Sequence, residues 1–199
     1  MNHSLVNSQI ADQLITYQLG SPAHANQSDW KIIRSDEIDP NWTIADEQVA
    51  AKIVLPFSLW IKIGSSKSIT EKALRGQIGV WFSADDDILK YSDLINAGKK
   101  IWSIIAIDFP IFRDGRGYST AALLRQRFGW DGELRAIGDI LIDQLIYLSR
   151  VGFDSFVLRD DQDIAIGLKQ FDLFTVTNQN SWRAKRSIAE LLDDVELTS

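Results

Sequence analysis

The sequence predicts an α/β fold with a mostly parallel sheet built from repeated βα units, arranged as an open doubly wound sheet or as a partial TIM-like half barrel. From residue 51 onwards, short runs of β-branched and apolar residues alternate with longer segments of helical periodicity. Short connections rich in glycine, serine and aspartate separate them. Parallel strands joined by helices need right-handed crossovers, so the carboxyl ends of the strands are expected on one edge of the sheet.

The elements follow from these patterns in chain order. Strands are predicted at residues 29–34, 52–55, 77–82, 101–107, 133–137, 155–158 and 174–177. Helices are predicted at residues 57–74 with an interruption near Gly64, and at 83–98, 119–128, 139–151, 161–171 and 181–194. Ser83 and Ser119 are the expected N-caps, and Gly98 and Gly152 the expected helix ends.

The N-terminal part of the chain differs from the rest in its pattern. Residues 1–28 carry Asn, Ser, Gln and His without sustained apolar periodicity, which predicts a weakly ordered segment with a short helix around residues 10–17. Residues 29–199 are predicted to form a single α/β domain, because no change of composition marks a boundary between domains.

Composition excludes several classes of site. The 199 residues contain no cysteine, and the two histidines, His3 and His24, both fall in the N-terminal segment. Disulfides, thiolate nucleophiles, iron–sulfur centres and a histidine triad or zinc site in the core are therefore not expected. Proton transfer would fall to Asp, Glu, Tyr or Lys. The acidic run at residues 85–87 is typical of a helix start, and no metal site is assigned.

Charge and hydropathy limit the partners. The net charge of −6 argues against a general nucleic-acid surface, since duplex binding needs phosphate neutralisation. No basic segment followed by an apolar one opens the chain, and no apolar stretch reaches the length of a membrane span. A cytoplasmic protein without membrane or nucleic-acid partners is expected.

The best candidate for a functional site is the stretch of residues 109–119 (FPIFRDGRGYS), where a strand-like run gives way to charge and glycine. The glycines beside Arg116 let the backbone approach a ligand, and free N–H groups at a helix start favour an anion. Tyr118 and Asp139 are the candidate catalytic residues. The predicted ligand-binding residues are Arg113, Asp114, Gly115, Arg116, Gly117 and Ser119.

Arginine is concentrated around this stretch. Residues 109–159 hold seven arginines and no lysine, whereas the rest of the chain holds four arginines and ten lysines. The planar guanidinium suits bidentate binding of carboxylate, phosphate or sulfur oxyanions. Structural ion pairs are expected for most of the seven, with Arg125 and Arg127 at exposed helix positions. Arg113 and Arg116 are assigned to a ligand.

An alternative interpretation of the same loop is dinucleotide binding. Gly115-x-Gly117 after a strand and before a helix resembles part of that fingerprint, but its third small position is occupied by Thr120. The acidic partner would be Asp139. A separate pattern concerns assembly: apolar residues cover most of the circumference of the predicted helix at residues 139–151, which favours a homodimer.

Several phrases of the central region carry a family resemblance. They are residues 114–119 (DGRGYS), 132–136 (GELRA), 138–139 (GD), 143–144 (DQ) and 152–154 (GFD). With them, residues 107–156 resemble a bacterial family of unknown function whose members are commonly encoded beside sulfite reductase and labelled oxidoreductases of sulfate assimilation. The resemblance is strong over this central quarter and weaker across residues 52–178. Val151 stands where many relatives have a cysteine, so a thiol mechanism does not apply at that position.

The resemblance implies an accessory protein of assimilatory sulfite reduction that binds a small oxyanion or a phosphate-bearing ligand at the loop of residues 109–119. The sulfite reductase hemoprotein is the implied protein partner. The alternative is an oxidoreductase that uses a nicotinamide or flavin cofactor at the same loop, with Tyr118 or Asp139 handling the proton. The sequence leaves open whether the chain is an enzyme and which cofactor it would use.

Overall fold

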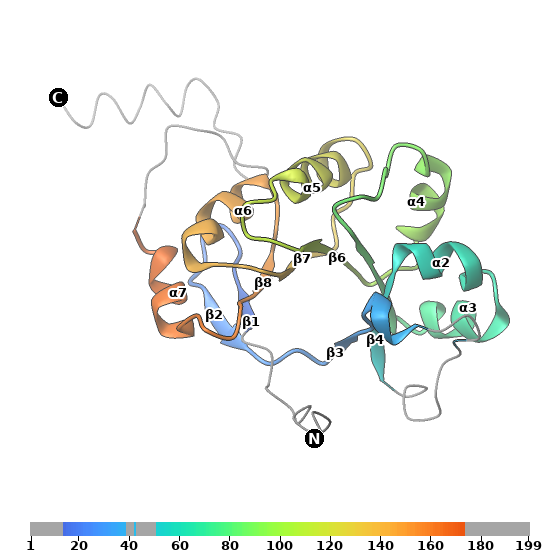
Figure 1. Cartoon of the computed structure of the whole chain (residues 1–199), viewed down its shortest axis with the longest axis horizontal. Helices are drawn as coiled ribbons and strands as arrows, with labels where there is room; N and C mark the ends of the chain where they lie inside the picture. Colours follow the sequence, from blue (N-terminus) through green and yellow to red (C-terminus); the bar gives the residue numbers. More distant parts are fainter. Residues whose placement is uncertain (1–13, 39–41, 43–50, 174–199) are drawn as a thin grey trace, which may run out of the picture.

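The computed structural model describes residues 14–38, 42 and 51–173, and these residues form an eight-stranded sheet with helices packed along it (Figure 1). The strand order is β2-β1-β8-β7-β6-β5-β4-β3. The strands are β1 (Leu14–Thr16), β2 (His24–Asn26), β3 (Trp30–Ile32), β4 (Lys52–Pro56), β5 (Ile78–Phe82), β6 (Ile104–Phe109), β7 (Glu133–Gly138) and β8 (Ser155–Val157).

The strand order distinguishes between the two predicted architectures. Strands β3 to β8 are parallel, and each of β4 to β8 pairs with the strand before it in the chain. Right-handed crossovers between such neighbours put all the helices on one face, whereas a doubly wound sheet needs a reversal of strand order. The sheet is a half-barrel with helices outside (Figure 1), which confirms the partial TIM-like alternative. An antiparallel hairpin, β1 and β2, is added beside β8.

Helices or short turns connect the strands. They are α2 (Phe57–Ile63), α3 (Lys67–Leu74), α4 (Ser92–Gly98), α5 (Arg116–Gln126), α6 (Leu145–Val151) and α7 (Ile164–Gln170), with 3₁₀ turns η1 (Ser35–Glu37) and η2 (Ile142–Gln144). The predicted interruption near Gly64 is confirmed, because α2 ends there and α3 begins three residues later. The predicted helix ends at Gly98 and Gly152 are also confirmed.

Both predicted N-caps were wrong, because aspartates close turns where serines were expected to begin helices. Asp86 accepts the Ser83 N–H at 2.7 Å, and α4 begins only at Ser92. The Asp114 carboxylate accepts the backbone N–H of Arg116 at 3.1 Å, so α5 begins at Arg116 and Ser119 lies inside it.

Two other predicted helices differ from the elements seen in the structure. The helix predicted at residues 139–151 is α-helical only from residue 145, because η2 precedes α6. The helix predicted around residues 10–17 is wrong for its described part. There, β1 pairs with β8, and Ile15 is fully buried, so residues 14–26 belong to the sheet instead of a loose lead-in. Residues 1–13 and the elements predicted at 174–177 and 181–194 lie outside the described residues.

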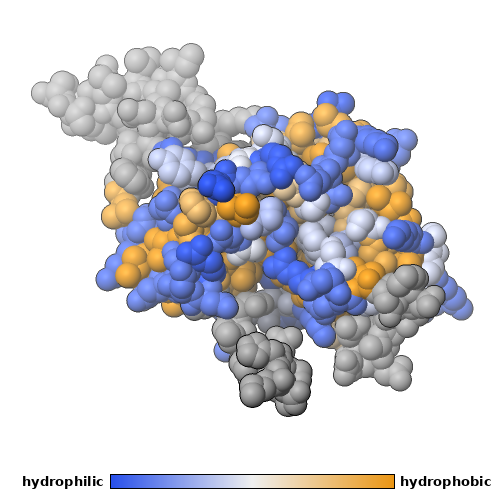
Figure 2. Space-filling model, viewed as in Figure 1, coloured by the Kyte–Doolittle hydropathy of each residue, from blue (hydrophilic) through white to orange (hydrophobic). Residues whose placement is uncertain are grey.

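The two faces of the sheet carry different apolar groups because side chains alternate along each strand. In β6, Ile105 and Ile107 join the main core under the helices, while Ile104 and Ala106 belong to a smaller cluster on the inner face. That inner cluster consists of Trp30, Val54, Trp81, Ile104, Ala106 and Ile137. On the surface seen in Figure 2, hydrophobic residues form separate patches among hydrophilic ones.

The apolar side of α6 is covered within the chain. Leu145 and Leu148 are fully buried, and α6 packs against α5 and α7. Ile142 and Ile146 are partly buried against the main core. Internal packing therefore covers the apolar side of this helix, and the homodimer stays a prediction.

Candidate functional site

The predicted loop lies at the carboxyl edge of the half-barrel, where the loops after β3, β5, β6, β7 and β8 meet. Ligands of parallel α/β folds bind at this edge. Three arginines, Arg34, Arg116 and Arg159, form ion pairs with aspartates there. These clusters of guanidinium and carboxylate groups make up the candidate site.

The first cluster surrounds Arg116 at the start of α5. Its Nε lies 2.9 Å from Asp114 Oδ1 and its Nη2 lies 2.6 Å from Asp114 Oδ2, a two-pronged contact. Its Nη1 bonds to Asp85 Oδ1 in the loop after β5. The Asp114 side chain is 16% exposed and that of Asp85 is 86% exposed. Arg116 thus links the loops that follow two neighbouring strands.

The second cluster surrounds Arg159 after β8, and here the two-pronged contact goes to the more exposed carboxylate. Arg159 Nη1 lies 2.7 Å from Asp139 Oδ1, while its Nε and Nη2 lie 2.6 and 2.7 Å from Asp161 Oδ1 and Oδ2. Asp139 is 20% exposed and Asp161 is 59% exposed. The second oxygen of Asp139 accepts the N–H of Phe112 at 2.8 Å. Both carboxylate oxygens of Asp139, a predicted catalytic residue, are therefore engaged. One pairs with Arg159 after β8, and the other accepts the N–H of Phe112 after β6.

Each of these arginines has one shielded and one exposed partner. We call Asp114 and Asp139 the shielded carboxylates, and Asp85 and Asp161 the outer carboxylates. The shielded Asp114 fixes the guanidinium plane of Arg116, whereas Arg159 makes a single contact with Asp139 and a two-pronged contact with the outer Asp161. An exposed ion pair contributes only about 0–1 kcal/mol to stability, so Asp85, with its single contact to Arg116, is held weakly.

A third ion pair, between Arg34 and Asp108, lies where β3 and β6 end. Arg34 Nη1 is 2.6 Å from Asp108 Oδ1, and the guanidinium lies over the Trp81 ring at 6.0 Å from its centroid. Sequence reasoning missed Arg34, Asp108 and the roles of Asp85 and Arg159. Their common signal is position, since each lies at or just beyond the end of a strand.

The predicted loop residues have different environments. A Cβ added at Gly115 would have nothing within 4 Å, whereas one at Gly117 would lie 2.5 Å from the Phe109 ring. Gly117 therefore lets α5 pack against β6 and is buried, while Gly115 leaves the backbone open to approach. Ser119 is exposed, and Arg113 is exposed with no ion pair to any described residue.

Tyr118, the other candidate catalytic residue, is half-buried. Its ring packs edge-on against Phe109 at a centroid distance of 5.6 Å. Burial raises the pKa of the Tyr118 hydroxyl above its ordinary value, and a hydrogen bond with Gln144 opposes this shift. The phenol is therefore protonated at neutral pH, which makes it a hydrogen-bond donor or a general acid rather than a base.

We expect the carboxyl group of Asp114 to titrate near pH 2, because hydrogen bonds from the Arg116 side chain lower its pKa from 3.8 to about 2. Since the folded pKa lies below the unfolded one, the pair stabilises the fold fully above pH 3.8, and this contribution is lost as the pH falls toward 2. Carbon NMR of the aspartate carboxyls measures the midpoint. In Arg116→Ala, the midpoint should return toward 3.8; an unchanged value contradicts the ion pair.

Arg125 was predicted to be exposed, and the structure shows the opposite. The residue is 1% exposed. Its guanidinium donates to the carbonyl oxygens of Gly152, Trp130 and Gly132, and its Nη2 lies 2.6 Å from Asp154 Oδ2. Arg125 therefore ties α5 to the end of α6 and to the loop before β7. It is a structural residue.

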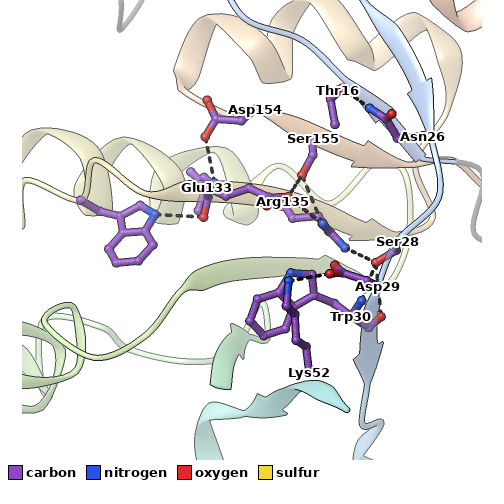
Figure 3. Close-up of polar contacts among 12 residues, drawn as sticks. Thr16, Asn26, Ser28, Asp29, Trp30, Lys52, Glu133, Arg135, Asp154 and Ser155 are labelled. Atoms are coloured by element: carbon purple, nitrogen blue, oxygen red, sulfur yellow. Dashed lines mark hydrogen bonds and ion pairs between the residues drawn. The ribbon is translucent and has the colours of Figure 1, made fainter. Parts of the chain in front are cut away.

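A second polar cluster lies at the amino ends of the strands, on the inner face (Figure 3). Arg135 is 3% exposed and donates to Glu133 Oε1 at 2.7 Å and to Ser28 Oγ at 2.6 Å. Lys52 of β4 pairs with Asp29 at 2.5 Å and lies over the Trp30 ring. These contacts join the two halves of the sheet and satisfy the buried Arg135 charge.

A pocket of about 480 Å³ adjoins this second cluster. It is lined by Thr16, Tyr17, Gln18, Ser21, Pro22, His24, Asp131, Gly132, Glu133, Asp154 and Ser155. The pocket therefore lies at the edge opposite the predicted loop. No sequence motif connects its three segments, which come together only because β1 pairs with β8.

The described residues contain no group of three or more His, Cys, Asp or Glu arranged to hold a metal ion. Within the same residues, no helix has the length and apolar character needed to cross a membrane.

Comparison with known proteins supports one relationship. The model of a family described as bacterial protein of unknown function (DUF934) matches residues 79–189. This match spans more than half of the chain and covers the loops after β5, β6, β7 and β8. No curated protein and no solved structure matches the chain.

Proposed function

Since the chain belongs to the bacterial family of proteins of unknown function (DUF934), we propose its function from its own carboxyl edge. We propose that it is an accessory protein of assimilatory sulfite reduction that binds a small oxyanion or a phosphate-bearing ligand there. The resemblance of residues 107–156 to proteins encoded beside sulfite reductase supports the metabolic role.

One observation carries the binding part of the proposal: Arg116 is fixed by a two-pronged contact with the shielded Asp114, while its other partner, Asp85, is exposed and makes a single contact. A fixed guanidinium loses little freedom when it binds, and its fork matches an oxyanion. An incoming sulfate, sulfite or phosphate would replace the outer carboxylate. The exchange removes a weak exposed pair and forms charge-assisted hydrogen bonds of about 1.5–3 kcal/mol.

The surroundings of Arg116 suit such a ligand. Gly115 leaves the backbone open, and Arg113 adds an exposed positive charge beside it. The outer carboxylates compete with the ligand, so affinity in the isolated protein depends on them. Neutralising an outer carboxylate should therefore strengthen binding, in contrast to the usual effect of removing a polar side chain.

We expect Arg116→Ala to weaken binding of sulfate, sulfite or phosphate by roughly tenfold to a hundredfold, the loss of one charge-assisted interaction. Asp85→Asn should strengthen the same binding by removing the competing carboxylate. Isothermal titration calorimetry with each anion measures both effects. Arg127→Ala, an exposed arginine at the end of the same helix, is the matched control and should bind like the wild type.

Equal affinities of the wild type, Arg116→Ala and Arg127→Ala would remove the site assignment. The alternative oxidoreductase function makes a different prediction for the same proteins. Saturable quenching of the tryptophan fluorescence by a reduced nicotinamide dinucleotide or a flavin would favour it over anion binding.

A further inference from the structure

Two neighbouring apolar side chains are exposed at the carboxyl edge. Ile111 and Phe112 lie at the tip of the loop between β6 and α5, and each is 46% exposed. Single exposed apolar residues are common on protein surfaces, but these two are adjacent and are followed by the exposed Arg113. Aromatic and arginine side chains are the most frequent anchors of protein interfaces.

The backbone of this tip is fixed on both sides. The Phe112 N–H donates to Asp139 Oδ2 at 2.8 Å, and the Phe112 carbonyl accepts from Gln144 Nε2 at 2.6 Å. Asp139 is itself paired with Arg159, so the loops after β7 and β8 both hold the tip. A loop whose backbone is already held in place loses less conformational entropy when it binds a partner.

Acidic residues outnumber basic ones around the tip. The loops after β5, β7 and β8 carry Asp85, Asp86, Asp87, Asp143, Asp160 and Asp161, and the arginines at this edge are Arg34, Arg113, Arg116 and Arg159. The complementary partner is therefore a basic surface, which would approach faster and in a defined orientation. A second copy of this chain would place like charges opposite each other, so self-association through this surface is disfavoured.

We propose that Ile111 and Phe112 anchor a docking surface for a protein with an apolar socket bordered by basic residues. The identity of that protein rests on the proposed accessory function, which points to the sulfite reductase hemoprotein. Basic residues of the partner would pair with the outer carboxylates Asp85 and Asp161. Pairing of a basic residue of the partner with Asp85 would release Arg116 for the oxyanion, so docking and ligand binding support each other.

The test uses the full chain and purified sulfite reductase hemoprotein, with binding measured by biolayer interferometry at two salt concentrations. The wild type should bind, and added salt should weaken binding. Phe112→Ser should weaken it by about tenfold or more, as the loss of an interface anchor does. The control Leu74→Ser changes an apolar residue that is 71% exposed at the end of α3, and it should leave binding unchanged.

The outcomes separate the two proposals. If the wild type, Phe112→Ser and Leu74→Ser bind the hemoprotein equally, the docking surface is wrong and the accessory function stands. If the wild type does not bind, the accessory function is overturned together with the partner of this surface. Sedimentation tests whether a second copy of this chain binds at the tip instead. A wild-type dimer that Phe112→Ser converts to monomer would assign the tip to self-association and overturn the proposal.

Discussion

Replacing Arg125 with methionine is expected to lower the free energy of unfolding by about 3–5 kcal/mol, the usual cost of removing one partner of a buried ion pair. Methionine fills much of the same space but donates no hydrogen bond. Asp154 would lose its 2.6 Å ion pair with Arg125, and the carbonyl oxygens of Gly152, Trp130 and Gly132 would lose their guanidinium donor. Buried acceptors without donors are the main source of the cost.

Urea denaturation followed by tryptophan fluorescence measures this loss. Arg127→Met is the matched control, because Arg127 lies two residues later and is exposed, so its effect should stay within about 0.5 kcal/mol. Arg125→Lys should also destabilise the fold, since one ammonium group cannot reach carbonyls on both sides as the planar guanidinium does. Equal denaturation midpoints for Arg125→Met and Arg127→Met would show that the buried contacts contribute nothing.

The second large effect is expected at Gly138, the last residue of β7. Its φ of +95° is one that side chains rarely adopt, and a Cβ there would lie 2.4 Å from the Phe109 carbonyl oxygen. A backbone oxygen cannot move aside without shifting β6. Gly138→Ala should therefore cost about 2–5 kcal/mol, the sum of backbone strain and overpacking. Because Asp108 Oδ1 would lie 2.8 Å from the same Cβ, the Arg34–Asp108 pair should also be disturbed.

Alanine substitutions at two other glycines separate the cost of backbone strain from the cost of overpacking. Gly129 has a φ of +63° with nothing near the added Cβ, so Gly129→Ala should show backbone strain alone, about 1–2 kcal/mol. Gly115 has an ordinary φ of −77° and open space, so Gly115→Ala should leave stability within about 0.5 kcal/mol of the wild type. The denaturation midpoint should be highest for Gly115→Ala, lower for Gly129→Ala and lowest for Gly138→Ala. A Gly138→Ala protein as stable as Gly129→Ala would contradict the close contact between the added Cβ and the Phe109 carbonyl oxygen.

The α/β class was predictable because it depends on local patterns. The apolar runs of β5 and β6 and the helix ends at Gly98 and Gly152 are each visible in a few consecutive residues. Helix starts were less predictable, because several polar side chains compete for the same N–H groups. Asp114 bonds the Arg116 N–H and displaces the expected cap at Ser119.

Features that depend on distant parts of the chain were missed. Strand β1 has three residues, and it joins the main sheet through its pairing with β8, which lies far away in the chain. The loop of residues 109–119 was placed correctly at the carboxyl edge, but its contacts with Asp85 and Asp139 join it to the loops after other strands and depend on how the sheet is assembled. Arg125 was misjudged because helical position alone does not show that a second helix ends against its side chain.

The pairing of β1 with β8 has a consequence for synthesis on the ribosome. Leu14 lies opposite Val157, so the hairpin emerges long before the strand it joins. At about 5–20 residues per second, translation needs roughly 7–30 s to cover that interval. Strands β3 to β7 can assemble meanwhile, because each of β4 to β7 adds beside the strand before it. Strand β1 is therefore among the last to dock, and the nascent hairpin keeps Ile15 uncovered until then.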